Sequence, residues 1–260
     1  MAPAHPAKGG GRKVGLARTL QFPDGRVAKA ARVDSPNELR TALDRMGLGE
    51  PRPVVLLIGG AGGLSEGDQS TLRPLFEDSL AAVIDSLGAV AVDGGTDVGV
   101  MRLLGRARAK TAASFPLVGV VARGTVELPG DRSSSAEAVR LEANHTHFVL
   151  VPGDRWGDES PWLDRVASAL AQGRPSVAVV VNGGDTAWAD AEHSVAGGRP
   201  IIAATGTGRA ADALSASARG EQSDPRAAAI AATGLLQAVD TAENPRNLSA
   251  AVERALTRGD

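Results

Sequence analysis

Five glycine-containing turns recur along the chain, and each has the composition of an anion-binding turn. They lie at residues 59–63, 94–96, 152–157, 183–184 and 206–208. Where a strand leads into a helix, the first N–H groups of the helix have no intrahelical partner and carry the positive end of the helix dipole. Glycine lets a ligand approach such a backbone closely. These turns predict phosphate or pyrophosphate binding, although glycine is also favoured in tight turns for geometry alone.

Polar side chains beside these turns add candidates for recognition or catalysis. Glu159 follows a glycine-rich turn, where it could complement the helix dipole, act as a general acid/base or hold a ribose hydroxyl. Arg209 could clamp a phosphate and Asp212 could bind a ribose, or the two could form a surface ion pair. Trp156 could stack on a base or serve in packing.

The segment ANHTHF places His145 and His147 on one face of an extended chain, as two metal ligands would lie. The chain has no cysteine, and no third ligand lies nearby in the sequence. This favours hydrogen-bonded structural histidines over a metal site. We therefore predict no bound metal and no required cofactor.

Two common nucleotide-binding fingerprints are incomplete in this sequence. Gly60 and Gly62 begin a G-x-G-x-x-G pattern, but Ser65 takes the place of the third glycine. Only Asp93 stands where a ribose-binding acid would follow a second strand, and there is no GxxxxGK[ST] motif. A hydride-transfer enzyme and a P-loop NTPase are both disfavoured.

The elements that must position these turns form a regular alternation. Apolar runs at residues 54–58, 89–92, 117–121, 148–151, 176–181 and 200–204 read as buried strands, and helical patterns such as residues 70–87 separate them. Residues 125–128 are a further short strand that could pair with the third run. The order predicts an α/β fold: a Rossmann-like, doubly wound, mostly parallel sheet with helices on both faces. In such a sheet the turns converge at one edge.

Four regions are predicted along the chain. Residues 1–12 are rich in proline, glycine and basic side chains and are expected to be disordered. Residues 13–50 read as two strands and a helix packed on the core, with Ser35 and Pro36 starting the helix and Gly47 ending it. Residues 51–218 form the ligand-binding domain. Residues 219–260 read as a linker and two alanine-rich helices, which pack on the sheet or on a partner subunit.

Composition limits the partners. The 260 residues carry a net charge of −2, which gives no basic field for nucleic acid. No stretch approaches the roughly 20 apolar residues needed to cross a bilayer, and the N-terminus lacks the apolar region of a secretory signal. We expect a cytoplasmic protein with no membrane insertion, a nucleotide-type small-molecule ligand and possible homo-oligomers.

Six motifs in a fixed order carry a family resemblance. IGGAGGL, AVDGGTDVGVMRLLG, LEANHTHFVLV, WGDES, VNGGDT and GTGRAAD occur across residues 54–215. This series resembles the LSDAT branch of the SLOG superfamily, whose eukaryotic members form the N-terminal cytoplasmic region of melastatin-type TRP channels. The resemblance implies a Rossmann-like fold that binds nucleotide-derived ligands, which in some channel relatives is ADP-ribose.

The wider superfamily includes the LOG phosphoribohydrolases, which use GGGxxGLMG and PGGxGTxxE motifs. Gly94, Gly95, Gly99 and Met101 match the first motif, while Thr96 replaces its third glycine and Arg102 its last. The second motif is echoed with altered spacing by Pro152, Gly153, Gly157 and Glu159. The departures favour ligand binding over catalysis.

We therefore expect a sensor of ADP-ribose, NAD or a related nucleotide. The alternatives are an N-glycosidic hydrolase that uses Glu159, and a scaffold with a vestigial pocket. The predicted ligand-binding residues are Gly59, Gly60, Ala61, Gly62, Gly63, Gly94, Gly95, Thr96, Gly99, Asn144, His145, Pro152, Gly153, Gly157, Glu159, Gly183, Gly184, Gly206, Thr207, Gly208, Arg209 and Asp212.

Overall fold

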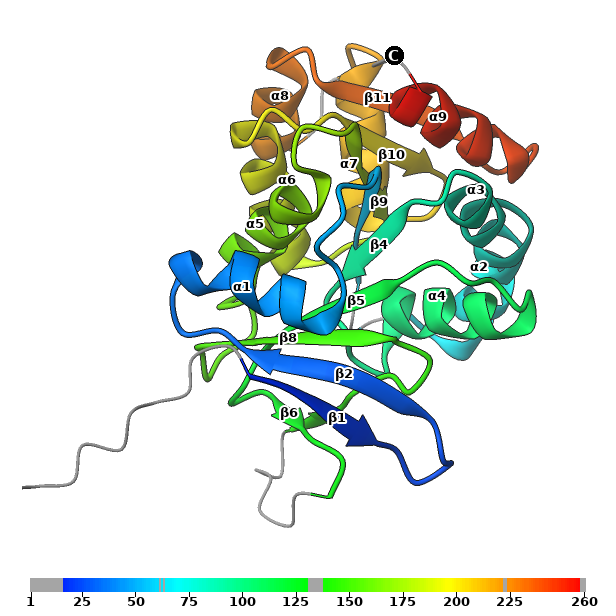
Figure 1. Cartoon of the computed structure of the whole chain (residues 1–260). Coiled ribbons are helices and arrows are strands. Elements are labelled where there is room, and N and C mark those ends of the chain that lie inside the picture. Colours follow the sequence, from blue (N-terminus) through cyan, green and yellow to red (C-terminus); the bar gives the residue numbers. More distant parts are fainter. Residues whose placement is uncertain (1–15, 61, 63, 131–137, 222–223, 258–260) are drawn as a thin grey trace, which may run out of the picture.

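One large sheet organises the chain (Figure 1). The computed structural model describes residues 16–60, 62, 64–130, 138–221 and 224–257; the predicted disorder of residues 1–12 lies outside these ranges, as do Ala61 and Gly63. Within them, nine strands lie in the order β1-β2-β8-β5-β4-β3-β9-β10-β11. The strands are β1 (Ala17–Gln21), β2 (Val27–Arg32), β3 (Val54–Gly59), β4 (Val90–Asp93), β5 (Leu117–Ala122), β8 (His147–Val151), β9 (Ser176–Val181), β10 (Ile201–Thr205) and β11 (Leu236–Asp240).

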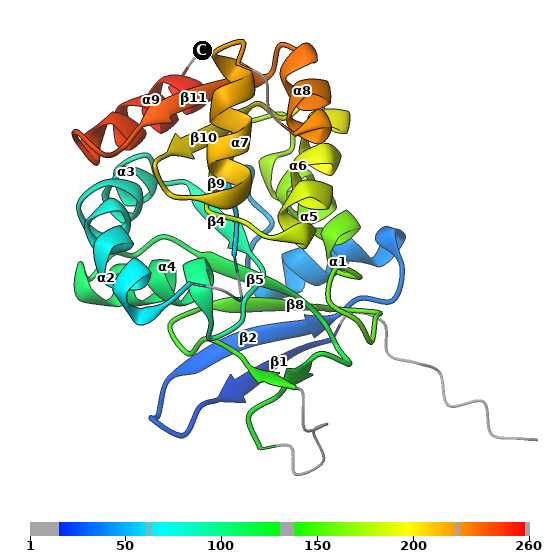
Figure 2. The same cartoon turned by 180° about the vertical axis from the view of Figure 1, so that it is seen from behind.

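All neighbouring strands of this sheet run parallel except β1 and β2, which form an antiparallel hairpin. Helices cover both faces, as Figures 1 and 2 show from opposite sides. One face carries α1 (Pro36–Met46), α5 (Ser160–Ala171), α6 (Asp185–Ala196), α7 (Arg209–Ala218) and α8 (Pro225–Ala232). The other face carries α2 (Glu66–Pro74), η1 (Leu75–Leu80), α3 (Ala81–Ser86), α4 (Gly99–Lys110) and α9 (Arg246–Thr257). The predicted Rossmann-like α/β fold is confirmed.

The central strand β3 shows why the strands read as unbroken apolar runs. Val54, Leu56 and Ile58 face one helical layer, whereas Val55 and Leu57 face the other. All five side chains are at most 2% exposed. Because successive side chains of a strand point to opposite faces, a strand covered on both sides needs an apolar residue at every position.

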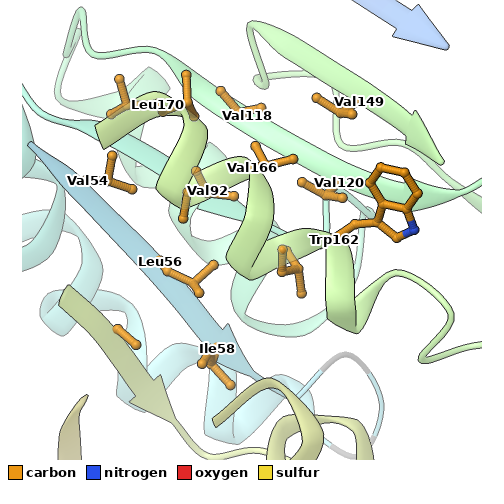
Figure 3. Packing of buried hydrophobic residues seen from close by; sticks show 14 of the residues in the cluster. Val54, Leu56, Ile58, Val92, Val118, Val120, Val149, Trp162, Val166 and Leu170 are labelled. Carbon is orange, nitrogen blue, oxygen red and sulfur yellow. The ribbon is translucent and has the colours of Figure 1, made fainter. Parts of the chain in front are cut away.

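Helix α5 shows how a helix is fitted to this sheet. Trp162, Val166 and Leu170 follow one another at a spacing of four and face the valines of β4, β5 and β8 (Figure 3). Val166 is fully buried and Leu170 is 1% exposed. This apolar stripe holds the start of α5, and with it Glu159, against the sheet.

The helix predicted for residues 70–87 begins earlier than expected. Ser65 accepts a hydrogen bond from the N–H of Asp68, and the Asp68 carboxylate accepts one from the N–H of Ser65. This capping box starts α2 at Glu66. The helix then continues through the π-helical η1, which directly follows Pro74. Proline has no N–H to donate to the preceding turn, so the regular bonding is interrupted there.

Two predictions need correction: the partner of one strand, and the helical character of the stretch beyond residue 218. Residues 126–127 (β6, Val126–Glu127) pair with β7 (Val139–Arg140), not with β5. Both edges of β5 are already taken by β4 and β8, so no position is free for a further strand. The stretch beyond residue 218, expected to be helical, contains β11, which pairs with the open edge of β10.

The N-terminal elements agree with prediction. A turn at residues 23–25 joins β1 and β2, and Pro36 opens α1. Gly47 ends α1 with a φ of 86°, in the left-handed region that glycine enters without strain. Leu39, Leu43 and Met46 are buried against the sheet.

The chain order reverses at β3. From β3 the chain passes outward through β4, β5 and β8, and then returns to the other side of β3 to form β9 and β10. In open α/β sheets such a reversal leaves a crevice at the carboxyl ends of the two central strands, and ligands bind there. Within the described ranges, no helix combines the length and the apolar character that crossing a bilayer requires.

Candidate ligand-binding site

A crevice of about 410 Å³ lies at this reversal point, between the carboxyl ends of β3 and β9. Gly60 and Gly62 line it from the turn after β3, and Arg209 lines it from the start of α7. The rest of its wall comes from Val98, Val139, Trp156, Gly184, Asp185 and Thr186. We call this cavity the switch crevice.

The first turn of α6 faces the switch crevice with free hydrogen-bond donors. Gly184 is the N-cap residue, and no side chain caps the helix. Among the described residues, the N–H groups of Gly184, Asp185 and Thr186 have no hydrogen-bond acceptor. The positive end of the α6 dipole is therefore available to an anion, with the Asp185 carboxylate as the negative group in the same wall.

Arg209 bridges the two sides of the crevice. Its Nη1 donates to the carbonyl oxygen of Gly62 at 3.2 Å. Its Nη2 lies 2.8 Å from the position that a Cβ on Gly184 would occupy, so a side chain there would displace the guanidinium. Arg209 has a φ of 53°, which L residues rarely adopt, and forms no ion pair with a described carboxylate. The arginine is held in a strained backbone position with its charge unpaired.

The turn after β10 is closed by its own side chains. Asp212 accepts hydrogen bonds from the N–H groups of Gly206 at 2.6 Å and Gly208 at 3.1 Å. The Thr207 hydroxyl accepts from the N–H of Asn182 and donates to the carbonyl oxygen of Ala204. The N–H groups of Gly206 and Gly208 are thus already engaged, and neither Asp212 nor Thr207 lines the switch crevice.

Asn182 ties the turns after β9 and β10 together. Its side-chain amide donates to the carbonyl oxygen of Thr207, and its side-chain oxygen accepts from the N–H of Gly183, both at 2.9 Å. A φ of 58° makes this possible, and asparagine tolerates that region better than most residues. Asn182 was absent from the sequence-based candidates, although an Asn before two glycines is a recognisable turn signal.

The turn after β4 is held by Asp93 and His145, although Oδ2 of Asp93 and the Thr96 hydroxyl have no partner among the described residues. The Asp93 carboxylate accepts from the N–H of Gly95 at 2.7 Å and lies 2.7 Å from Nε2 of His145, whose Nδ1 is 3.0 Å from Glu142. Burial alone would lower the pKa of His145, but the Asp93 and Glu142 carboxylates raise it to about 9. His145 is therefore a buried cation that joins two anions. Asp93 is fully buried and does not reach the crevice.

Gly95 serves close packing in this turn. A Cβ at Gly95 would lie 2.8 Å from the Cα of Gly119 on β5, and the φ of Gly95 is 66°. Gly99, with a φ of 52°, begins α4 directly after Val98, which lines the crevice. Gly94 and Thr96 line a deeper cavity described below.

The turn after β8 positions Glu159 and Trp156. The Asp158 carboxylate accepts from the N–H groups of Asp154 and Arg155, and Glu159 accepts from the N–H of Gly157 at 3.1 Å. Gly153 packs against Asp158, and the lining of the switch crevice contains neither Gly153 nor Pro152. Trp156 is 46% exposed and stands in the crevice wall.

A small second cavity of about 40 Å³ adjoins the switch crevice, with which it shares Trp156 and Thr186. Thr96, Glu159, Thr186 and Asp190 supply polar side chains to its lining, beside Gly59 and Gly94. We call this cavity the inner recess. Burial raises the pKa of Glu159, and the nearby Asp158 carboxylate raises it slightly further. Hydrogen bonds from the N–H groups of Glu159 and Gly157 lower the pKa, but the net shift is upward. Burial raises the pKa of Asp190 to about 7, and Glu159 adds to this while the Ser160 hydroxyl opposes it.

Asp190 is the residue of the recess that sequence reasoning missed. It lies in the middle of α6, between the buried residues Ala187, Ala191 and Ser194. A carboxyl group on the buried face of a helix was the available signal, because an acidic side chain is rarely buried without a partner or a function.

The remaining candidates lie apart from the crevice. His147 bonds to the Thr146 hydroxyl and the carbonyl oxygen of Met46, and burial lowers its pKa to about 4. Asn144 bonds to Glu142 and lines a separate cavity of about 840 Å³ beside the β1–β2 turn. No cluster of three or more potential metal ligands occurs in the parts of the chain described.

A family model described as SLOG in TRPM, prokaryote, matches residues 52–250. The chain belongs to this family. The SLOG match begins just before β3 and ends within α9, so it includes every strand that contributes to the switch crevice.

Related SLOG-containing chains are found among cation channels. Member 2 of the transient receptor potential cation channel subfamily M is 26% identical in mouse over 228 residues and 25% identical in rat over 203 residues. These matches cover 73% and 65% of this chain but only 15% and 13% of the channels. The member-like 2 protein of Nematostella vectensis is 25% identical over 209 residues, which is 66% of this chain and 13% of that protein. The chain thus corresponds to a small part of each channel.

A solved structure shares the fold. The crystal structure of TM1055, a structural genomics target, superposes with a TM-score of 0.54 at 19% identity. The match covers 78% of this chain and 99% of that one. At this identity the likeness concerns the fold, and it supports the Rossmann-like assignment.

Proposed function

We propose that this chain binds a nucleotide-derived ligand, such as ADP-ribose, NAD or a related nucleotide, in the switch crevice and acts as a sensor of it. The observation that carries the proposal is that the uncapped start of α6 and Arg209 line the same crevice, and that Arg209 forms no ion pair with a described carboxylate. Backbone N–H groups and a guanidinium are the donors that phosphate oxygens use in proteins.

The wall of the crevice suits the other parts of such a ligand. Trp156, Val98 and Val139 offer an aromatic ring and two apolar side chains to a base. The volume of about 410 Å³ lies within the range of small-molecule sites. Of the three residues expected to bind ribose hydroxyls, Glu159 lines a cavity that adjoins the crevice, whereas Asp212 and Thr207 bond within their own turn.

The family supports the same class of ligand. The chain belongs to a SLOG family, and the resemblance described above implies nucleotide-derived ligands, with ADP-ribose in some channel relatives. Its identity to the channels is about one quarter over a small part of their length, so the ligand of this chain has to be measured directly.

A thermal-shift panel of ADP-ribose, NAD, AMP and ATP tests the proposal. A ligand at a hundred times its Kd stabilises the folded state by about 2.7 kcal/mol, which raises the Tm. Arg209→Gln should reduce the shift, because the phosphate loses its charged partner. Arg219→Gln is the matched control, since Arg219 is exposed at the other end of α7 and pairs with Glu221. The absence of any shift at millimolar ligand would overturn the proposal.

A second candidate function is hydrolysis of a nucleotide at its N-glycosidic bond. The raised pKa of Glu159, together with Asp190 in the same recess, favours it, because a carboxyl group with a raised pKa is better suited to general acid catalysis. Release of free base from AMP, abolished by Glu159→Gln, is the expected result. A wild-type rate equal to that of buffer would exclude this activity.

A further inference from the structure

The inner recess contains polar atoms that are left without partners. Within the described residues, the Thr96 hydroxyl is buried and has no hydrogen-bond partner. Oδ1 of Asp190 is also buried with no partner in hydrogen-bond geometry, although the Ser160 hydroxyl lies near enough to lower the pKa of Asp190. Thr96 is 1% exposed and Asp190 is 8% exposed, and both line the recess. Buried polar groups in folded proteins are almost always bonded, so this pair calls for a physical reason.

The size and charge of the recess restrict what can enter it. A volume of about 40 Å³ accepts a water molecule or one hydroxyl-bearing carbon, but it is too small for a phosphate group. Its described lining contains two carboxyl groups and no cationic side chain. The phosphate donors lie outside it, at the start of α6 and on Arg209. A neutral group that both donates and accepts hydrogen bonds fits these partners.

We infer that the inner recess seats a sugar hydroxyl of the ligand, and that Thr96 and Asp190 select for it. This assignment rests on the proposed nucleotide site and fixes the orientation of the ligand in it. The phosphate lies on the α6 N-terminus and Arg209, and the sugar points inward past Trp156 and Thr186, the two residues that both cavities share.

The same polar groups would distinguish one ligand from another. In the free protein a water molecule fits the recess and can bond to Thr96 and Asp190. A ligand hydroxyl that displaces this water would accept from Thr96 and bond to Asp190 in its place. Selectivity for the hydroxyl follows, because a deoxy ligand leaves the buried groups unpaired.

Isothermal titration of the whole chain tests the assignment. The probes are ADP-ribose, AMP, 2′-deoxy-AMP and 3′-deoxy-AMP. The wild-type chain should bind AMP about tenfold or more tightly than the deoxynucleotide that lacks the seated hydroxyl. Thr96→Val and Asp190→Asn should lower the affinity for ADP-ribose and AMP by a similar factor. The affinity of both variants for the deoxynucleotide that lacks the seated hydroxyl should stay almost unchanged. Glu192→Gln, an exposed position on α6, is the matched control and should change nothing.

A second readout separates recognition from structure. Thr96→Val should weaken nucleotide binding while the Tm of the free protein stays close to that of the wild type, because valine has nearly the shape of threonine and loses only a bond to water. Equal wild-type affinity for AMP and both deoxynucleotides, or unchanged affinity of both variants for ADP-ribose, would overturn this inference and leave the proposed function standing. If none of the four probes binds, both this inference and the proposed function are wrong.

Discussion

Asp190 gives the site a measurable dependence on pH. Burial raises its pKa from the ordinary value of 3.8 to about 7, so between these pH values the folded chain binds a proton that the unfolded chain has released. The stability contribution of this group therefore falls as pH rises from about 4 to 7 and stays low above that. Asp190→Asn removes the ionisable group and should stabilise the free protein by roughly 1–3 kcal/mol at pH 8 but hardly at pH 4.

Urea unfolding at pH 4, 6 and 8 measures this difference. Glu192→Gln on the same helix is the control for the loss of one acidic side chain. An Asp190→Asn variant whose stability relative to wild type is the same at all three pH values would contradict a raised pKa.

The contribution of His145 to stability should change at alkaline pH, whereas that of Asp190 changes at acidic pH. Burial alone would lower the pKa of His145, but Asp93 and Glu142 raise this pKa from the ordinary value of 6.5 to about 9. The stabilisation from this cation is complete below about pH 6.5 and is lost as pH rises through 9. His145→Gln leaves two buried carboxylates without their cation and should cost about 3–5 kcal/mol at pH 7.

Guanidinium unfolding between pH 6 and 10 tests this, with His193→Gln as the control on α6. The difference in the free energy of unfolding between wild type and His145→Gln should become smaller as pH rises above 8. A difference in the free energy of unfolding that is the same from pH 6 to pH 10 would show that His145 is neutral in the folded chain.

At the residue scale, the sequence identifies the groups that follow strands and misses those inside helices. Arg209 and Glu159 stand at helix starts after glycine turns, where a sequence pattern marks them. Asp190 becomes part of a site only because α6 packs against α5, which brings it near Glu159. That proximity depends on tertiary packing, which no local spacing encodes.

At the scale of elements, glycine-rich turns differ in whether their donors are free. Asp93, Asp158 and Asp212 each accept hydrogen bonds from the backbone of their own turn. The start of α6 lacks such a carboxylate contact. A short acidic side chain within a glycine turn thus fills the place that an external anion would take, whereas the described N–H groups at the start of α6 remain available.

Asp212→Ala tests this distinction between turns. Loss of the carboxylate leaves the N–H groups of Gly206 and Gly208 unbonded and should cost about 1 kcal/mol of stability, as loss of a helix cap does. The affinity for ADP-ribose should stay within about twofold, because Asp212 does not line the crevice. An affinity loss as large as that of Arg209→Gln would show that Asp212 contacts the ligand.

At the scale of the whole molecule, the sequence predicts the parallel core well and its margins poorly. Strands such as β3 and β9 are apolar at nearly every position because helices cover both their faces. In β11 only Val239 is buried, so this edge strand shows no apolar run. The β6–β7 pair has two residues in each strand, too few for a periodic pattern.

A chain that ends at Ala218 should lose much of its stability. It lacks β11, which covers the edge of β10, and α9, whose Leu248, Val252 and Leu256 are buried. Burying such side chains contributes about 1.5–3 kcal/mol each. We expect a Tm at least 10 °C lower or an aggregated product, measured by thermal unfolding and light scattering. A monomer as stable as the full chain would show that these elements are dispensable.

The bond between Arg209 and Gly62 has a consequence for protein synthesis. It joins two residues 147 positions apart, on opposite sides of the crevice. At 5–20 residues per second, a ribosome takes roughly 7–30 s to make the intervening chain. A nascent chain therefore carries the β3 turn long before it has the guanidinium that completes the proposed phosphate site. A cellular nucleotide would stabilise only chains translated through α7, and so would favour nearly finished molecules over partly made ones.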